Sequence, residues 1–176
     1  MVNNFEKKFE EIFNFCVYYN QLNAPLPAGG ARARIAKFEL NILKDLIFEK
    51  IPVNDFPNLK ISYSKGNGRF PKVPWIAIHP IASSVSKGLS VALCFAKDGR
   101  GIVAGLMVPN NYHLNISTVT RVDKKKSNNF LDVKGSTSSS YNNKFINPKE
   151  FYREKLNETE LINHLIDSLK LLKKNS

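Results

Sequence analysis

Hydrophobic residues in the first fifty positions recur at the three- and four-residue spacing of amphipathic helices. This spacing predicts one helix over residues 3–22 and a second over residues 31–50, which Pro52 ends. The stretch 23–30 contains prolines and glycines and predicts a loop. We interpret both helices as scaffold. Their expected inward residues are Phe5, Phe9, Ile12, Phe13 and Cys16 in the first, and Ile35, Phe38, Ile42 and Leu46 in the second.

From residue 59 onward the pattern changes to the two-residue period of strands. Ile61 and Tyr63 alternate with serines, and the apolar run 73–78 contains a proline, which a sheet tolerates at the start of a strand. Residues 97–101 hold an Asp-Gly pair, which is typical of a hairpin turn. Together with the runs 88–95 and 102–108, these features indicate an antiparallel meander of about four strands.

The last third of the chain is less regular. Residues 130–133 form a candidate short strand, and Asn147 before Pro148 predicts a helix start. Asn157, with Glu160 three residues later, predicts the start of a final helix. The class is therefore α+β, a mostly antiparallel sheet packed by N- and C-terminal helices in a single domain. We divide it into a helical scaffold (1–58), a basic sheet with loops (59–145) and C-terminal helices (146–176).

The most informative stretch is the loop predicted between the first two strands. Gly66, Asn67 and Gly68 tolerate positive φ angles, and Arg69 and Lys72 follow them. The only tryptophan of the chain, Trp75, comes just after this loop. A flexible cationic loop between two strands is a candidate contact surface for a polyanion.

The net charge of +11 is unevenly distributed along the chain. Residues 1–58 contain seven Lys/Arg and seven Asp/Glu, and residues 146–176 contain six and five. Residues 59–145 contain thirteen basic residues against three acidic ones, so this segment holds +10 of the excess. Solubility alone gives no reason for such segregation, and we therefore favour a nucleic-acid-binding face.

Several other classes of protein fit poorly. No apolar run is long enough to span a membrane, and the N-terminus does not have the pattern of a signal peptide. Cys16 and Cys94 are isolated in apolar surroundings, which favours free thiols in a reducing cytoplasm. There is no Walker A motif, no metal-ligand spacing and no carboxylate pair in the basic segment. An enzyme is therefore not expected, and His79, His113 and His164 are interpreted as surface or packed residues.

Three segments together resemble the N-terminal specificity domain of McrB-type restriction proteins. These are residues 63–68 (YSKGNG), 73–78 (VPWIAI) and 87–91 (KGLSV). The resemblance covers residues 59–108 well and residues 141–172 loosely. It implies a module that binds double-stranded DNA and reads a modified cytosine by base flipping. It also implies a GTPase motor and a nuclease in a following domain or a partner protein, and it implies no cofactor and no membrane.

The resemblance also suggests roles for individual residues. Trp75 matches the tryptophan that stacks on the extruded base, and Tyr141 and Phe130 are candidates for the opposite wall of the pocket. Asn67 stands where the best-known member has a tyrosine, and an asparagine can hydrogen-bond the orphaned base but cannot stack. The expected DNA-contacting residues are Lys65, Gly66, Asn67, Gly68, Arg69, Lys72, Lys124, Lys125 and Lys126.

Two alternatives remain at this stage. A nucleic-acid binder with the same basic face but no pocket would bind without preference for a modified base. A protein-interaction domain would direct its basic face toward an acidic partner and would bind no DNA.

Overall fold

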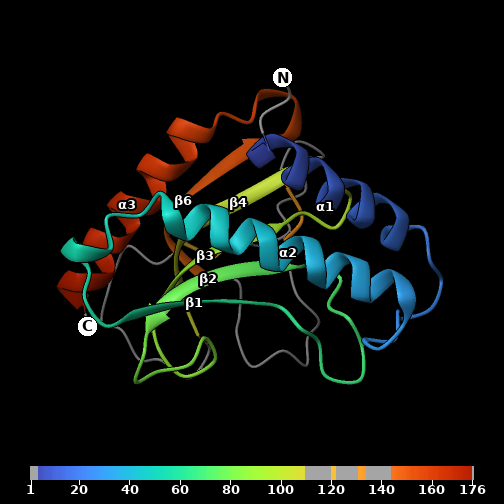
Figure 1. Ribbon diagram of the computed structural model, residues 1–176, viewed down its shortest axis with the longest axis horizontal. Coiled ribbons are helices and arrows are strands. Elements are labelled where there is room, and N and C mark those ends of the chain that lie inside the picture. Colours follow the sequence, from blue (N-terminus) through green and yellow to red (C-terminus); the bar gives the residue numbers. More distant parts are fainter. Residues whose placement is uncertain (1–3, 110–119, 122–130, 134–143, 176) are drawn as a thin grey trace.

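The computed structural model describes residues 4–109, 120–121, 131–133 and 144–175 (Figure 1). Three α-helices, six strands and two short 3-10 helices occur in this part of the chain. In chain order they are α1 (Asn4–Asn20), α2 (Ala31–Glu49), η1 (Val53–Asp55), β1 (Leu59–Tyr63), β2 (Trp75–Pro80), β3 (Ser90–Phe95), β4 (Gly101–Val108), β5 (Thr120–Arg121), β6 (Lys144–Tyr152), η2 (Arg153–Lys155) and α3 (Glu158–Asn175).

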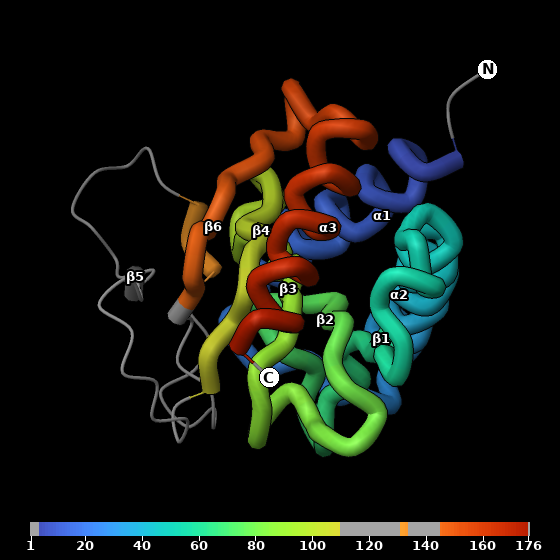
Figure 2. The backbone as a smooth tube through the Cα atoms, turned by 90° about the vertical axis from the view of Figure 1, so that its left-hand side faces the viewer, coloured from blue at the N-terminus to red at the C-terminus, as the bar shows by residue number. Residues whose placement is uncertain are grey.

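The described strands form one antiparallel sheet in the order β1-β2-β3-β4-β6-β5. Figure 2 shows β6, β4, β3, β2 and β1 following one another across the molecule. The predicted four-strand meander is confirmed as β1 to β4. The fold class is confirmed as well, because helices from both ends of the chain pack on the sheet.

The three helices cover one face of the sheet, and the main hydrophobic core lies between them and the strands (Figure 1). The predicted inward face of α1 is confirmed, since all five of its residues are buried. The ring of Phe9 lies 5.7 Å from that of Phe95 in β3. A smaller apolar cluster occupies the opposite face of the sheet, around Ala77, Ala92 and Cys94. The sheet is therefore apolar on both faces, and both cysteines are buried free thiols as predicted.

The predicted inward face of α2 is wrong. Ile35 and Phe38 are 57% and 63% exposed, and Ile42 and Leu46 are only partly buried. The helix carries two apolar faces, and the one with small residues packs inward because alanines allow its backbone to approach α1 closely. The buried residues of α2 are Ala33, Ala36, Leu40, Leu43 and Ile47.

The predicted helix start at Asn147 and Pro148 is also wrong, since both residues lie inside β6. The pairing of β4 with β6 shifts register between Ala104 and Leu106, which marks a β-bulge. Asn147 adopts a φ of 52° there, and a bulge is one of the few places where a sheet accepts a proline. Residues 131–133 form no strand, while Phe130 lies outside the described residues.

The predicted start of the last helix is confirmed by its cap. The backbone N–H of Glu160 donates to Oδ1 of Asn157 over 2.9 Å, which satisfies one of the free donors at the start of α3. Leu161, Leu165 and Leu169 then point into the main core. No helix in the described ranges combines the length and hydrophobicity needed to cross a membrane.

Candidate nucleic-acid interface

The loop of residues 64–74, here called the glycine loop, is closed at its base by Ser64. The backbone N–H of Ser64 donates to the carbonyl of Trp75 over 2.9 Å, and the N–H of Trp75 donates to Oγ of Ser64 over 3.0 Å. Ser64 is buried. The two ends of the loop are therefore held together where β1 ends and β2 begins.

The glycine loop also packs along the α1–α2 connection, which comprises residues 21–30. The N–H of Ala28 donates to the carbonyl of Gly68 over 3.0 Å, and the N–H of Phe70 donates to the carbonyl of Leu26 over 2.8 Å. The buried hydroxyl of Tyr19 donates to the carbonyl of Phe70 over 2.8 Å and accepts from the N–H of Leu26 over 3.0 Å. Two segments about forty residues apart thus form one hydrogen-bonded surface.

The tip of the glycine loop is a tight turn around Asn67. Gly66 and Gly68 have φ angles of 72° and 71°, so the positive φ expected of these two glycines is confirmed, whereas Asn67 does not adopt it. A Cβ atom on Gly66 would lie 2.5 Å from the carbonyl oxygen of Arg69, whereas a Cβ atom on Gly68 would meet nothing within 4 Å. Only a glycine therefore fits at position 66, while the tip at Asn67 and Gly68 is exposed.

Of the six cations predicted to contact DNA, Lys65, Arg69 and Lys72 lie on this loop, and all three are exposed. The Nζ atoms of Lys65 and Lys72 lie 5.5 Å and 5.7 Å from the ring centres of Tyr63 and Tyr19. These rings attract the ammonium groups without neutralising their charge. Within the described residues, neither lysine nor Arg69 forms a salt bridge.

Helix α2 adds cations to this surface that the sequence interpretation missed. Arg32 and Arg34 are exposed in its first turns, directly after the α1–α2 connection. The guanidinium carbon of Arg32 lies 5.1 Å from the ring centre of Tyr18. The ammonium of Lys37 donates to the carbonyl of Ala28 over 2.7 Å, and Ala28 in turn bonds to Gly68. Because residues 1–58 have no net charge, counting charges along the sequence did not reveal these cations.

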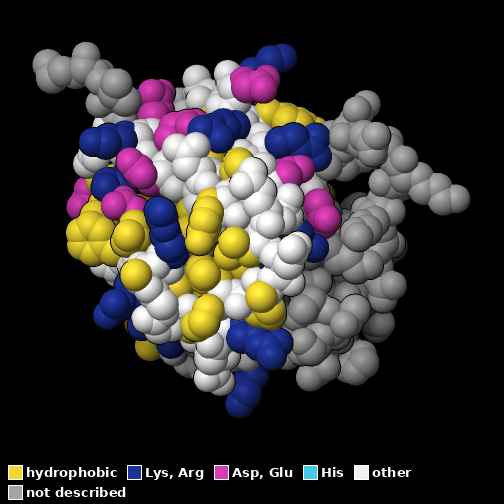
Figure 3. Space-filling model, turned by 90° about the vertical axis from the view of Figure 1, so that its right-hand side faces the viewer, with side chains coloured by type: hydrophobic (Ala, Val, Ile, Leu, Met, Phe, Trp, Pro, Cys, Tyr) yellow, Lys and Arg dark blue, Asp and Glu magenta, His cyan; other side chains and the backbone are white. Residues whose placement is uncertain are grey.

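Counting charges over shorter stretches of the sequence would have revealed this group of cations. Residues 12–38 and 56–96 contain eight Lys/Arg and no Asp/Glu, and the fold brings these two stretches into contact. The eight salt bridges among described residues involve no residue of either stretch. In Figure 3, the lower part of the face shows Lys/Arg and hydrophobic side chains, while the acidic side chains gather above it.

Trp75 lies at the end of the glycine loop on the sheet face that points away from the helices. It is half-buried, and it packs at the margin of the smaller apolar cluster rather than in the main core. Its cross-strand neighbour is Cys94, whose pKa is raised to about 12 by burial, so the thiol stays neutral. The indole is thus anchored on one side by an apolar, uncharged neighbour.

The structure brings Lys65, Gly66, Asn67, Gly68, Arg69 and Lys72 together in one loop, with Trp75 at its end. The other predicted site residues lie outside the described residues. They are the predicted DNA contacts Lys124, Lys125 and Lys126 and the predicted pocket residues Phe130 and Tyr141.

Two histidines in the described part are packed as predicted, and His113 lies outside it. Nε2 of His79 lies 2.8 Å from the hydroxyl of Ser62, and Nε2 of His164 lies 3.0 Å from the carbonyl of Ala104. Burial lowers the pKa of both rings, which keeps them neutral near pH 7. Both therefore contribute to packing and hydrogen bonding rather than to the cationic surface.

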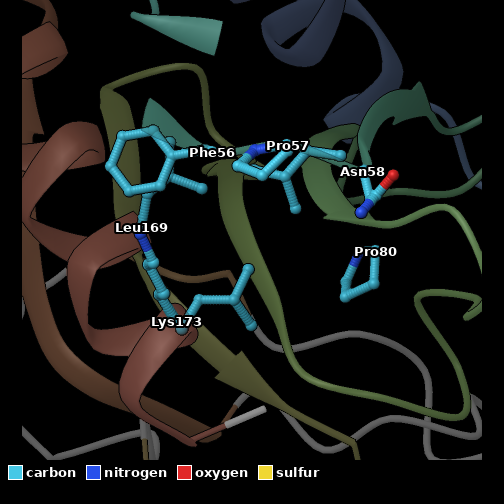
Figure 4. Close-up of a pocket in the computed structure, with 8 residues that line it drawn as sticks. Phe56, Pro57, Asn58, Pro80, Leu169 and Lys173 are labelled. Atoms are coloured by element: carbon cyan, nitrogen blue, oxygen red, sulfur yellow. The ribbon is translucent and has the colours of Figure 1, made fainter. Parts of the chain in front are cut away.

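An apolar pocket of about 230 Å³ lies at the opposite end of β1 from the glycine loop (Figure 4). Phe56, Pro57, Leu169 and Leu172 line it, and Lys173 lies at its margin. Its volume is below the roughly 300–1,000 Å³ of typical small-molecule sites. None of the predicted site residues that the structure describes lines it.

Comparison with known protein families identifies the chain. The profile of the family described as the MrcB-like N-terminal domain matches residues 18–108, which is just over half of the chain. The chain belongs to this family. The matched region runs from the end of α1 to the end of β4 and includes the α1–α2 connection, the glycine loop and Trp75.

Membership in the MrcB-like family supports a DNA-binding module of McrBC-like restriction systems. The resemblance noted in residues 59–108 is thereby confirmed. Comparisons with curated proteins and with solved structures gave no match.

Proposed function

We propose that this protein is the specificity module of a modification-dependent restriction system and recognises a modified cytosine in double-stranded DNA by base flipping. The observation that carries the proposal is the composite surface at one end of the sheet. There a fixed loop displays cations without salt bridges to described residues, and the strand that follows the loop begins with a half-buried tryptophan. Phosphate contacts and a stacking surface are the two elements that base flipping requires.

In this proposal the glycine loop and Trp75 have separate tasks. Lys65, Arg69 and Lys72 neutralise phosphates and position the duplex at the end of the sheet. The tip at Asn67 reaches the space that the extruded base leaves, where its amide hydrogen-bonds the orphaned partner base. Trp75, at the start of β2, stacks on one face of the extruded base. Tyr141 or Phe130 is the proposed residue on the opposite wall of the base pocket. Lys124, Lys125 and Lys126 extend the phosphate contacts.

The module itself performs no chemistry in this proposal. A GTPase motor and a nuclease, in a following domain or a partner protein, cleave the DNA that the module recognises.

Fluorescence anisotropy with matched methylated and unmethylated duplexes tests the proposal. The wild-type protein should prefer the modified duplex, and Trp75→Ala should abolish that preference while it leaves affinity for plain DNA nearly unchanged. Base–aromatic stacking is worth about 1–3 kcal/mol, which corresponds to a preference of roughly fivefold or more. A fluorescent base analogue at the target should also brighten on binding, provided that Trp75 itself does not quench it.

Tyr152→Ala is the matched control, because Tyr152 is the other partly buried aromatic residue packed on the same apolar cluster. It should keep the preference, and both variants should melt within a few degrees of each other. Equal affinity of the wild type for both duplexes, with a steep salt dependence, would identify a non-specific binder instead. Absence of DNA binding at low salt would point to a protein-interaction domain.

A further inference from the structure

We infer that the first two turns of helix α2 form a second phosphate-contacting segment, in which Arg32 and Arg34 bind the DNA backbone beside the glycine loop. This inference rests on the proposed DNA-binding function and extends it to a helix that carries no excess charge as a whole. The duplex then lies across two segments of the chain rather than on one loop.

The first support is the physical connection between the two segments. The glycine loop bonds to the α1–α2 connection through Gly68 and Phe70, and α2 begins at Ala31, three residues after Ala28. The backbone N–H of Arg34 donates to the carbonyl of Gly30 over 2.9 Å, so the start of the helix is fixed directly to this connection. The backbone of the helix start is therefore held at a fixed distance from the loop, and Arg32 and Arg34, which are two positions apart, leave the helix on different sides.

The second support is the contrast between these arginines and their neighbours on the same helix. Lys44 pairs with Asp45 over 3.0 Å, and Glu39 pairs with Lys8 over 2.6 Å. Arg32 and Arg34 are exposed and form no salt bridge with any described residue. No acidic residue occurs between positions 12 and 38, so nothing nearby in the sequence competes with a phosphate for them.

The third support separates the arginines from Lys37. The ammonium of Lys37 already donates to the carbonyl of Ala28, which makes this lysine a positioning residue for the α1–α2 connection. The guanidinium of Arg32 lies against Tyr18, which orients the group without an opposite charge. Arginine binds phosphate through paired N–H donors, so a pre-oriented guanidinium loses little entropy when it binds.

The test compares the salt dependence of DNA binding for two double variants of equal net charge. Arg32→Gln with Arg34→Gln removes the proposed contacts, and Lys170→Gln with Lys174→Gln removes two exposed charges from α3. Each lost phosphate contact lowers the slope of log K against log salt by about 0.9, so the α2 variant should lose nearly two units. Affinity at 0.1 M salt should fall roughly eightfold per contact, equally for modified and plain duplexes.

Phosphate ethylation interference supplies a second readout. The wild type should show interfering phosphates that the α2 variant no longer shows, while Arg32→Lys with Arg34→Lys should retain the slope. If the wild type binds DNA and the α2 variant behaves like the α3 control in both assays, the inference is overturned and the DNA-binding function stands. If the wild type itself binds no DNA, the proposed function fails, and the inference fails with it.

Discussion

The two ends of the molecule differ in whether their exposed cations form salt bridges with carboxylates. Toward the β6 edge of the sheet, here called the matched end, cations are matched with carboxylates, as in Lys97 with Asp132 over 3.5 Å and Lys149 with Glu160 over 2.6 Å. Arg153 similarly bridges to Glu10 of α1. At the end formed by the glycine loop and the start of α2, exposed cations stand without carboxylates among the described residues.

This contrast shows where the charge can act on a partner. Exposed salt bridges contribute little to stability, typically about 0–1 kcal/mol, but they remove the field that would attract a polyanion. The positive potential around the matched end is therefore weak, while the potential around the glycine loop and the start of α2 remains strong. Net charge by itself would not reveal the difference, because both ends contain lysines and arginines.

The largest effect is expected at Gly66, where the cationic end depends on backbone geometry. Gly66→Ala should destabilise the protein by about 3 kcal/mol, since the positive φ costs about 1–2 kcal/mol and the new Cβ must also displace the carbonyl of Arg69. Gly68→Ala should cost only about 1 kcal/mol, because the space beside it is open. Chemical denaturation of both variants measures this. Equal costs would mean that the loop is less tightly closed than described.

The next effect concerns the charges of the loop itself. Arg69→Ala with Lys72→Ala should lower DNA affinity roughly sixtyfold at 0.1 M salt and reduce the salt slope by nearly two units. Lys149→Ala with Lys170→Ala removes the same charge from the matched end and should change the slope far less, because distant charges are screened. Anisotropy titrations over a range of salt concentrations compare the two. Similar salt slopes for both variants would mean that the two ends of the molecule do not differ in their contribution to DNA binding.

A smaller effect is expected for the hydroxyl that joins the two segments of the cationic end. Tyr19→Phe removes both hydrogen bonds of this hydroxyl and leaves the N–H of Leu26 and the carbonyl of Phe70 without it, at a cost of about 1–2 kcal/mol. Because the loop loses its support, DNA affinity should fall together with stability. Phe9→Leu is a suitable control, since the ring of Phe9 packs on Phe95 in the main core and donates no hydrogen bond. It should lower stability alone.

The smallest effect is the pH dependence of stability from His79 and His164. Burial lowers the pKa of both rings in the folded state below 6.5, so the unfolded chain binds protons more readily. Stability should be complete above about pH 6.5 and should decrease as the pH falls below it. Melting curves between pH 7.5 and 5.5 should show this decrease, and a His79→Gln, His164→Gln double variant should flatten it. An unchanged slope in that variant would assign the pH dependence to carboxylates.

Local patterns predicted most of the fold. The stripe of α1, the Asp-Gly hairpin and the Asn157 cap each follow from a few neighbouring residues, and each is confirmed. The errors arose where distant packing decides between local alternatives. Helix α2 has two apolar faces, and its packing against α1 and β1 selects the one with alanines. Asn147 and Pro148 have the local pattern of a helix start, but β4 pairs with them as a strand with a bulge.

For the candidate site, the sequence identified the glycine loop and Trp75 but missed Arg32 and Arg34. The loop was visible because its residues are contiguous. The arginines belong to a helix whose charges sum to neutrality with those of its neighbours, and only the hydrogen bonds of Ala28 and Phe70 show that the connection leading into this helix borders the loop.

The closure of the glycine loop has a consequence for engineering the protein. Ser64, Gly66 and Phe70 hold the base of the loop, while the side chain of Asn67 at its tip is exposed. The tip of the loop can therefore be changed without changing its base. Position 67 can be randomised in a library while the contacts of Ser64, Gly66 and Phe70 stay intact. Under the proposed role of Asn67 at the orphaned base, selection at this single position should yield new preferences for the base opposite the target.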